Sequence, residues 1–163
     1  MRLFSIKQKN GFTLIELLIV IAIIAILAAA IFVALDPVTR FQEARDSRRY
    51  SDLTNALTAI VTDQVDNGGA YLTEITALTD GLYYTIGTNG VTGCNTGCTA
   101  QTTQAACVDL TGLVTEGYLG SVPMDPSTGT AALTDYYLMK SATGTVEVGA
   151  CDPEAEASIS LIR

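Results

Sequence analysis

Near its start the sequence reads Gly11-Phe12-Thr13-Leu14-Ile15-Glu16, followed by an unbroken apolar run from Leu17 to Leu35. As a helix rising about 1.5 Å per residue, this run is about 28 Å long, close to the hydrocarbon thickness of a bilayer. A helix that is apolar on every side suits a membrane better than a small soluble domain, so we expect a membrane-spanning segment. Glu16 is unusual there, because a carboxylate just inside an apolar run is costly unless it is paired.

The residues before Gly11 include three basic side chains and no acid. The positive-inside bias therefore predicts that this leader stays in the cytoplasm. A cleaved secretory signal is the alternative interpretation, because Ala28-Ala29-Ala30 imitates its cleavage site. The apolar run continues beyond these alanines, however, and is longer than a usual signal core.

A short basic leader ending in glycine, then Phe-Thr-Leu-Ile-Glu and an apolar run, resembles the N-terminus of type IV pilins and type II secretion pseudopilins. The resemblance covers Lys9 to about Leu35. It implies that a prepilin peptidase/N-methyltransferase cuts after Gly11 and methylates the new N-terminus, Phe12. It also implies that an inner-membrane assembly platform moves the subunit from the lipid into a filament of identical or related subunits. There, Glu16 faces the terminal amine of a neighbour.

The pairing of Glu16 with an amine is physically reasonable, because an ammonium and a carboxylate that are each costly in hydrocarbon compensate one another. Two other interpretations of Glu16 stay open. It is also placed to act as a first-turn acid favoured by the helix dipole, or to reach the membrane interface. The sequence departs from many pilins in one respect, since it has no proline near Val33 and none before Pro37.

The composition excludes several classes of function. Removal of the leader takes away three basic residues and no acid, so the formal net charge of −8 becomes −11. Beyond Asn67 there are ten acids and only Lys140 and Arg163 as bases, which does not suit a nucleic-acid groove. The chain has no histidine, which excludes His-based catalysis and His-ligated metals. No nucleophile–base pair or phosphate-binding glycine loop stands out, so we do not expect an enzyme.

After the apolar run, Asp36-Pro37 predicts a kink or short break, and a helical pattern then continues to Gly68-Gly69. An apolar stripe with helical spacing indicates that this half packs on a head. Its members are Leu53, Ala56, Leu57, Ile60, Val61, Gln64 and Val65. A mixed-charge neck precedes the stripe, for which we expect a solvated face or inter-subunit ion pairs rather than a site for anionic lipid or nucleic acid. It comprises Arg40, Glu43, Arg45, Asp46, Arg48, Arg49 and Asp52.

The remaining sequence predicts a small antiparallel sheet, so the fold class is α+β, a long N-terminal helix packed on a small head. Four segments are rich in strand-forming residues: 82–86, 136–139, 145–148 and 158–162. A helical turn within 71–78, a helical segment at 108–119 and a turn at 142–144 complete the head. We assign residues 1–11 to the leader, 12–35 to the transmembrane and polymerisation helix, 36–67 to the amphipathic helix and 68–163 to the extracytoplasmic head.

The loop from Thr88 to Thr103 contains little apolar sequence and should lie on the surface. All cysteines of the chain lie in the head, which the leader places outside the cytoplasm, where disulfides are permitted. They are Cys94, Cys98, Cys107 and Cys151. We favour two disulfides, of which three pairings exist, over a zinc site or free buried thiols.

A second resemblance is shorter. The stretch Val122-Pro123-Met124-Asp125-Pro126 is similar to the Pro-x-Asp-Pro sequence before the last strands of major pseudopilins and many pilins. Major pseudopilins bind calcium in a nearby loop, and Asp125, Asp135 and Asp152 are the candidate ligands here, since calcium takes six to eight oxygens. Because no compact loop of alternating acids is present, we favour turn-forming and surface roles for these aspartates and expect no cofactor.

These observations predict a single-pass membrane protein whose head lies outside the cytoplasm and which joins a cell-surface pilus or a pseudopilus. A pilus subunit for adhesion, motility or DNA uptake is slightly favoured over a type II secretion pseudopilin by the cysteine-stapled loop. A minor subunit of either filament is a further reading, although Glu16 argues against a place at the tip. A monomeric membrane-anchored binding module remains the alternative from another class.

Overall fold

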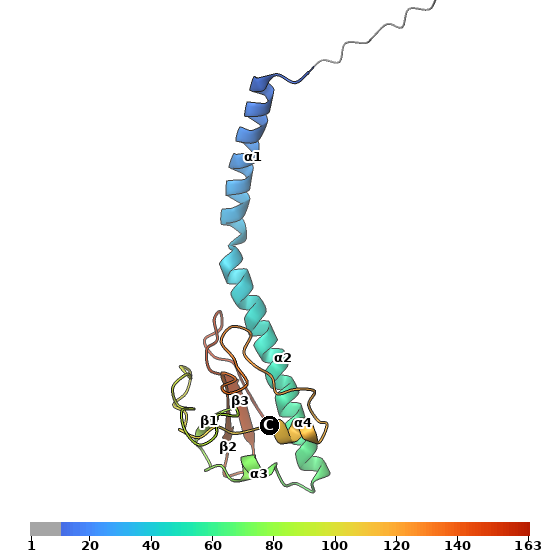
Figure 1. Ribbon diagram of the computed structural model, residues 1–163, viewed down its shortest axis with the longest axis vertical. Helices are drawn as coiled ribbons and strands as arrows, with labels where there is room; N and C mark the ends of the chain where they lie inside the picture. The colour runs from blue at the N-terminus through green and yellow to red at the C-terminus, as the bar shows by residue number, and fades with distance from the viewer. Residues whose placement is uncertain (1–10) are drawn as a thin grey trace, which may run out of the picture. The chain divides into compact units, whose positions relative to one another are not determined.

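The computed structural model describes residues 11–163, which divide into two compact units, one ending at Arg40 and the other spanning Phe41–Arg163. Most of the predicted leader, residues 1–10, lies outside the described part of the chain. The second unit is an α+β head with a four-stranded antiparallel sheet, which confirms the predicted fold class (Figure 1).

Helix α1 spans Leu14–Leu35 and coincides with the apolar run. Thr13 precedes it with an extended backbone and caps its first turn. None of the side chains of α1 is buried. By its length and composition, this is a helix that can cross a membrane.

Asp36 interrupts the helix. Its backbone is left-handed, with φ of 37° and ψ of 71°. The cause lies in the next residue, because a proline disfavours the right-handed helical region for the residue before it. Pro37 then begins helix α2, at a position where a missing N–H costs nothing. The Asp36 carboxylate accepts a hydrogen bond from the Thr39 hydroxyl at 2.7 Å. The left-handed residue between α1 and α2 confirms the expected break.

Helix α2 spans Pro37–Asp66 and buries one face, along which positions 46, 49, 53, 56, 60 and 63 are spaced alternately three and four apart. The buried positions are Asp46, Arg49, Leu53, Ala56, Leu57, Ala59, Ile60 and Asp63. The predicted apolar stripe is correct from Leu53 to Ile60 but wrong at its end. From Ile60 the buried face continues to Asp63, whereas the Val65 side chain is 70% exposed.

The sheet has the order β1-β2-β3-β4, and every neighbouring pair is antiparallel. Its strands are β1 (Tyr83–Thr85), β2 (Tyr136–Lys140), β3 (Val146–Ala150) and β4 (Ser160–Ile162). The turn between β2 and β3 contains Gly144, whose φ of 85° favours glycine, at the place where the sequence predicts a turn. All four predicted strands are present, although β1 and β4 are shorter than expected.

The hydrophobic core lies between α2 and the sheet. Leu53 and Ile60 of α2 belong to one buried cluster with Leu138 of β2 and Val148 of β3, and all four side chains are 0% exposed. Leu138 and Val148 are partners in the strand register, so they form one layer of the core. Burial of such side chains contributes about 1.5–3 kcal/mol each before the entropic cost of ordering.

The head also contains two short helices. Helix α3 spans Thr73–Thr76, within the segment where a helical turn is expected, and helix α4 spans Thr111–Thr115. The helix predicted over 108–119 is therefore too long. Val108 instead bridges to Ile86 beside the sheet, and Gly117, with a φ of 88°, follows the end of α4.

Two disulfides hold the loop between β1 and α4, as the sequence predicts. One joins Cys94 to Cys107, with 5.3 Å between Cα atoms. The other joins Cys98 to Cys151 just after β3, with 4.4 Å between Cα atoms. No described cysteine is free, so all four are disulfide-bonded.

Candidate functional site

The N-terminal motif forms a reciprocal cap at the start of α1. The backbone N–H of Glu16 donates to Thr13 Oγ1 at 3.3 Å, and the backbone N–H of Thr13 donates to Glu16 Oε2 at 2.8 Å. The Thr13 hydroxyl donates to the same carboxylate oxygen at 2.8 Å. This capping box satisfies N–H groups that otherwise lack a partner and places a negative charge at the positive end of the helix.

Gly11 and Phe12 lie in exposed, non-helical backbone just before this cap. The Phe12 side chain is 91% exposed. A peptidase needs such accessible backbone, so the peptide bond after Gly11 is placed where cleavage is feasible. Cleavage itself, and the pairing of Glu16 with the amine of a neighbour, stay predictions.

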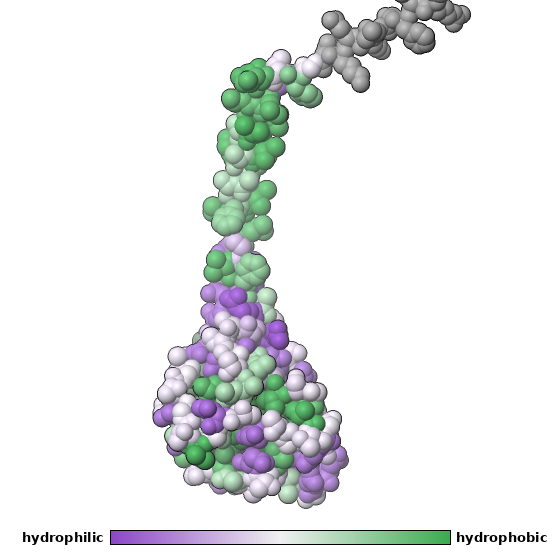
Figure 2. Space-filling model, in the orientation of Figure 1, coloured by the Kyte–Doolittle hydropathy of each residue, from purple (hydrophilic) through white to green (hydrophobic). Residues whose placement is uncertain are grey.

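The surface of α1 is apolar along its whole length, as Figure 2 shows for this helix. Its exposed large side chains include Ile19, Ile23 and Leu27, each about half accessible or more. Exposure of so much apolar area to water is unfavourable at roughly 25 cal/mol per Å². Lipid or other apolar helices must therefore surround α1. Glu16 is the only charged residue of this helix, so its carboxylate is the only charge placed in these apolar surroundings.

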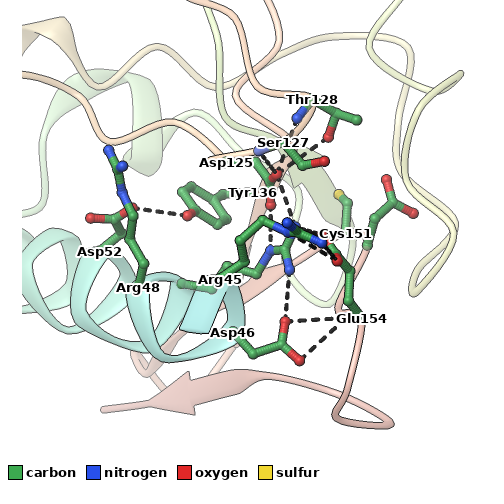
Figure 3. Close-up of polar contacts among 12 residues, drawn as sticks. Arg45, Asp46, Arg48, Asp52, Asp125, Ser127, Thr128, Tyr136, Cys151 and Glu154 are labelled. Atoms are coloured by element: carbon green, nitrogen blue, oxygen red, sulfur yellow. Dashed lines mark hydrogen bonds and ion pairs between the residues drawn. The ribbon is translucent and has the colours of Figure 1, made fainter. Parts of the chain in front are cut away.

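The head contains a second polar cluster, around the buried guanidinium of Arg49. Figure 3 labels its three acidic members, Asp46, Asp125 and Glu154. Nε and Nη2 of Arg49 donate to the two carboxylate oxygens of Asp125, at 2.5 and 3.0 Å. Nη1 donates to Asp46 at 2.7 Å, and Nη2 also reaches Glu154 at 3.0 Å. The side chains of Arg49 and Asp125 are 1% and 0% exposed, so this is a bidentate ion pair inside the head.

The partners compensate the cost of burying these charges. Burial alone would raise the pKa of Asp125, but hydrogen bonds from Arg49 and from the backbone of Ser127 and Thr128 lower it below its usual value. The pKa of Asp46 is lowered in the same way, against the effect of burial. Both carboxylates are therefore ionised at neutral pH, and the cluster needs the cation at its centre.

The cluster joins three segments that are distant in sequence. Asp46 accepts hydrogen bonds from the backbone N–H groups of residues 154–156, the shortest at 2.7 Å from Ala155. Arg45 pairs with Glu154, and Arg49 reaches the turn at Asp125. The predicted solvated neck is thus wrong for Asp46 and Arg49, which face inward. Arg49 precedes Leu53 by four residues and Asp46 precedes it by seven, and these helical spacings are the signal that identifies both as members of the buried face.

The turn-forming role predicted for Asp125 is confirmed, because its carboxylate accepts from the N–H groups of Ser127 and Thr128. The predicted surface position is wrong, because Asp125 is buried. Its oxygens accept from Arg49 and from the N–H of Ser127, which does not fit a calcium ligand. Asp135 is buried as well, and burial followed by the charge of Asp152 raises its pKa. Among residues 11–163, no three acidic or cysteine side chains are arranged to hold one metal ion.

Comparison with known proteins adds one finding. A family model described as the prokaryotic N-terminal methylation motif matches residues 6–32. The match covers the last residues of the leader, the capping box and most of α1. No curated protein and no solved structure matched the chain.

We predict that Arg49→Met destabilises the head by about 3–5 kcal/mol, because it leaves Asp125 and Asp46 buried without their cation. Arg48→Met is the matched control, since the Arg48 side chain is 66% exposed and makes one ion pair to Asp52 at 3.7 Å. Its expected cost is below about 1 kcal/mol. Denaturation of the full-length chain in non-ionic detergent, followed by near-ultraviolet circular dichroism, measures both. Equal losses for the two variants would contradict the role of Arg49.

The same cluster predicts a loss of stability in acid. Because the pKa of Asp125 is lower in the folded head than in the unfolded chain, its contribution is present above about pH 4 and is lost as the pH falls through the folded value. The melting temperature of the chain in detergent should therefore fall steeply below about pH 4. Asp125→Asn should melt lower at neutral pH and show a shallower acid dependence. An unchanged slope in this variant would show that Asp125 is not involved.

Proposed function

From the prepilin motif of type IV pilins and pseudopilins that this chain carries, we propose that it is a structural subunit of a type IV pilus-like filament. The motif supports a pilin or pseudopilin and implies processing by prepilin peptidase and assembly with other pilin subunits. It points to a structural subunit rather than an enzyme. Together with the apolar N-terminal helix, it supports a membrane-anchored pilin that is assembled at the surface.

The observation that carries the proposal is an apolar helix without a buried side chain, in a chain whose head has its own core. The core of the head consists of residues from Leu53 onward, including Leu53 and Ile60 of α2. The apolar helix is therefore free to be covered by lipid in the membrane and by identical helices in a filament. Such an exchange of one apolar environment for another costs little, which suits a subunit that leaves the membrane during assembly.

In this proposal the peptidase removes residues 1–11, the new N-terminus at Phe12 is methylated, and the subunit stays in the cytoplasmic membrane until the assembly platform extracts it. The head remains outside the cytoplasm, where its disulfides between Cys94 and Cys107 and between Cys98 and Cys151 are stable. The finished filament is a cell-surface pilus used for adhesion, motility or DNA uptake.

A second candidate function is that of a major pseudopilin in type II protein secretion. The observation that favours it is the Pro-x-Asp-Pro stretch that ends at Pro126. In this chain, however, Asp125 of that stretch binds Arg49, a structural role that serves either kind of filament equally well. We therefore keep the pilus as the leading proposal.

Processing can be tested by the intact mass and N-terminal sequence of the chain from its native membrane fraction. We expect a terminus at Phe12 carrying one extra methyl group. In Gly11→Val the uncut chain should accumulate, because the motif places the cut directly after this glycine. A start at Met1 in the unmodified chain would indicate a fixed membrane anchor, and a start after Ala30 would indicate a secreted protein.

The role of Glu16 can be separated from its role as a helix cap. Glu16→Gln keeps an oxygen that accepts from the Thr13 N–H but removes the charge, whereas Glu16→Ala removes both. If Glu16 pairs with the amine of a neighbour, both variants should insert into the membrane and yield few filaments in sheared preparations. Normal filament yield from Glu16→Gln, with loss only in Glu16→Ala, would assign Glu16 to capping alone.

A further inference from the structure

Asparagine is followed directly by glycine at three places in the chain. They are Asn10-Gly11, Asn67-Gly68 and Asn89-Gly90. This dipeptide is chemically reactive, because glycine has no side chain to shield its backbone nitrogen from the amide of the asparagine before it. Asn10 lies outside the described residues, whereas the other two pairs lie within them, in exposed backbone that belongs to no helix or strand. These two pairs can therefore be compared.

The reaction of such a pair is deamidation, and it has two steps. The glycine backbone nitrogen attacks Cγ of the asparagine side chain. A nitrogen–carbon bond forms, the bond from Cγ to the amide nitrogen breaks, and ammonia leaves with the proton of the glycine N–H. Water then opens the resulting five-membered succinimide at either of its carbonyl groups, which gives aspartate or isoaspartate. Water is the only reagent consumed.

Hydrogen bonds hold the pair Asn67-Gly68 away from this reaction. The backbone N–H of Gly68 donates to the carbonyl of Val65 at 3.3 Å, and the carbonyl of Asn67 accepts from the N–H of Ala70 at 3.3 Å. The side-chain Nδ2 of Asn67 donates to Oδ1 and to the carbonyl oxygen of Asp63, at 2.6 and 3.0 Å. Because both reacting groups are engaged, the ring can form only after these bonds break.

The pair Asn89-Gly90 is held much less. Within residues 11–163, neither the carbonyl of Asn89 nor the N–H of Gly90 has a hydrogen-bond partner. The peptide group that has to turn toward the side chain is therefore unrestrained, although the Asn89 N–H bonds to Ala132 and the Gly90 carbonyl bonds to Cys107. The side-chain Nδ2 of Asn89 makes one hydrogen bond, to the carbonyl of Thr92 at 3.1 Å.

We infer that Asn89 is a site of spontaneous deamidation in the folded chain and that the hydrogen bonds around Asn67 protect it from the same reaction. The two pairs share the reactive dipeptide and its exposure. They differ in the hydrogen bonds of the peptide group and of the side-chain amide, so the fold selects which of them reacts.

Deamidation changes the loop around Asn89. The new carboxylate cannot donate, so it loses the bond to Thr92 and places a negative charge beside that carbonyl oxygen. Isoaspartate also adds a carbon to the main chain just before Gly90, whose carbonyl accepts from Cys107 at 2.8 Å. The reaction therefore alters the backbone that contacts the loop closed by the disulfide between Cys94 and Cys107.

The test follows both asparagines in one sample. The full-length chain, with its disulfides intact, is incubated in non-ionic detergent at physiological temperature, at neutral and at mildly alkaline pH. It is then reduced and digested in mildly acidic buffer, where deamidation is slow, with a protease that cuts after glutamate. Glu16 and Glu74 lie between the asparagine–glycine pairs, so each pair falls in a separate peptide. Mass spectrometry measures the replacement of NH by O, and isoaspartyl methyltransferase labels isoaspartate.

We expect the peptide containing Asn89 to lose its unmodified form first, while the peptide containing Asn67 keeps most of it. The loss should be faster at higher pH, because the Gly90 nitrogen attacks after losing its proton. In the reduced chain unfolded in denaturant, both asparagines should convert at similar rates. Asn89→Gln should remove the mass gain from its peptide, because glutamine needs a larger ring that forms slowly. Asn67→Gln is the matched control and should leave that gain unchanged.

Three results would overturn the inference. The first is an unmodified Asn89 after an incubation that converts the unfolded chain. The second is conversion of Asn67 in the folded chain as fast as that of Asn89. The third is the same ratio of the two rates in the folded and the unfolded chain, which would assign the difference to neighbouring residues instead of hydrogen bonds. The readout requires neither processing nor filament assembly, so it is independent of the proposed function.

Discussion

The buried guanidinium of Arg49 is the interaction on which the organisation of the head depends. It joins α2 to the turn at Asp125 and to the loop at Glu154, segments that the hydrophobic core alone does not connect. Buried charges are costly, and a pair of this kind contributes less to net stability than its short distances suggest. The ion pair contributes specificity to the fold. The five N–H donors of a guanidinium have fixed directions, so only one arrangement of the surrounding carboxylates satisfies them.

The chain combines two regions that require different surroundings. Helix α1 is apolar, has no buried side chain and needs an apolar medium or apolar partners. The head buries a continuous core and carries a strongly acidic surface that needs water. The interruption at Asp36 lies where the apolar run ends and the charged sequence begins. The left-handed Asp36 and the following Pro37 interrupt the helix. The side chains change from apolar to polar at the same place.

The sequence predicts well those features that depend on local pattern. The apolar run, the break before Pro37, the strands and the helical spacing from Leu53 to Ile60 follow from propensity and periodicity, and all are present. Features that depend on tertiary contacts were not predictable in the same way. Charged residues are normally exposed, so Arg49 and Asp46 were assigned to solvent, and only their register with Leu53 indicates otherwise. The pairing of the cysteines likewise requires the fold, because the sequence allows three pairings.

The two edge strands of the sheet differ in how far neighbouring backbone covers them. β1 is shielded by bridges to Thr103 and Val108, while β4, within the described residues, pairs only with β3. An open edge is a template for pairing with another chain. β4 has only three residues, Ser160–Ile162, too few for a lasting intermolecular ladder. The short β4 therefore offers little backbone for amyloid-like pairing with another head.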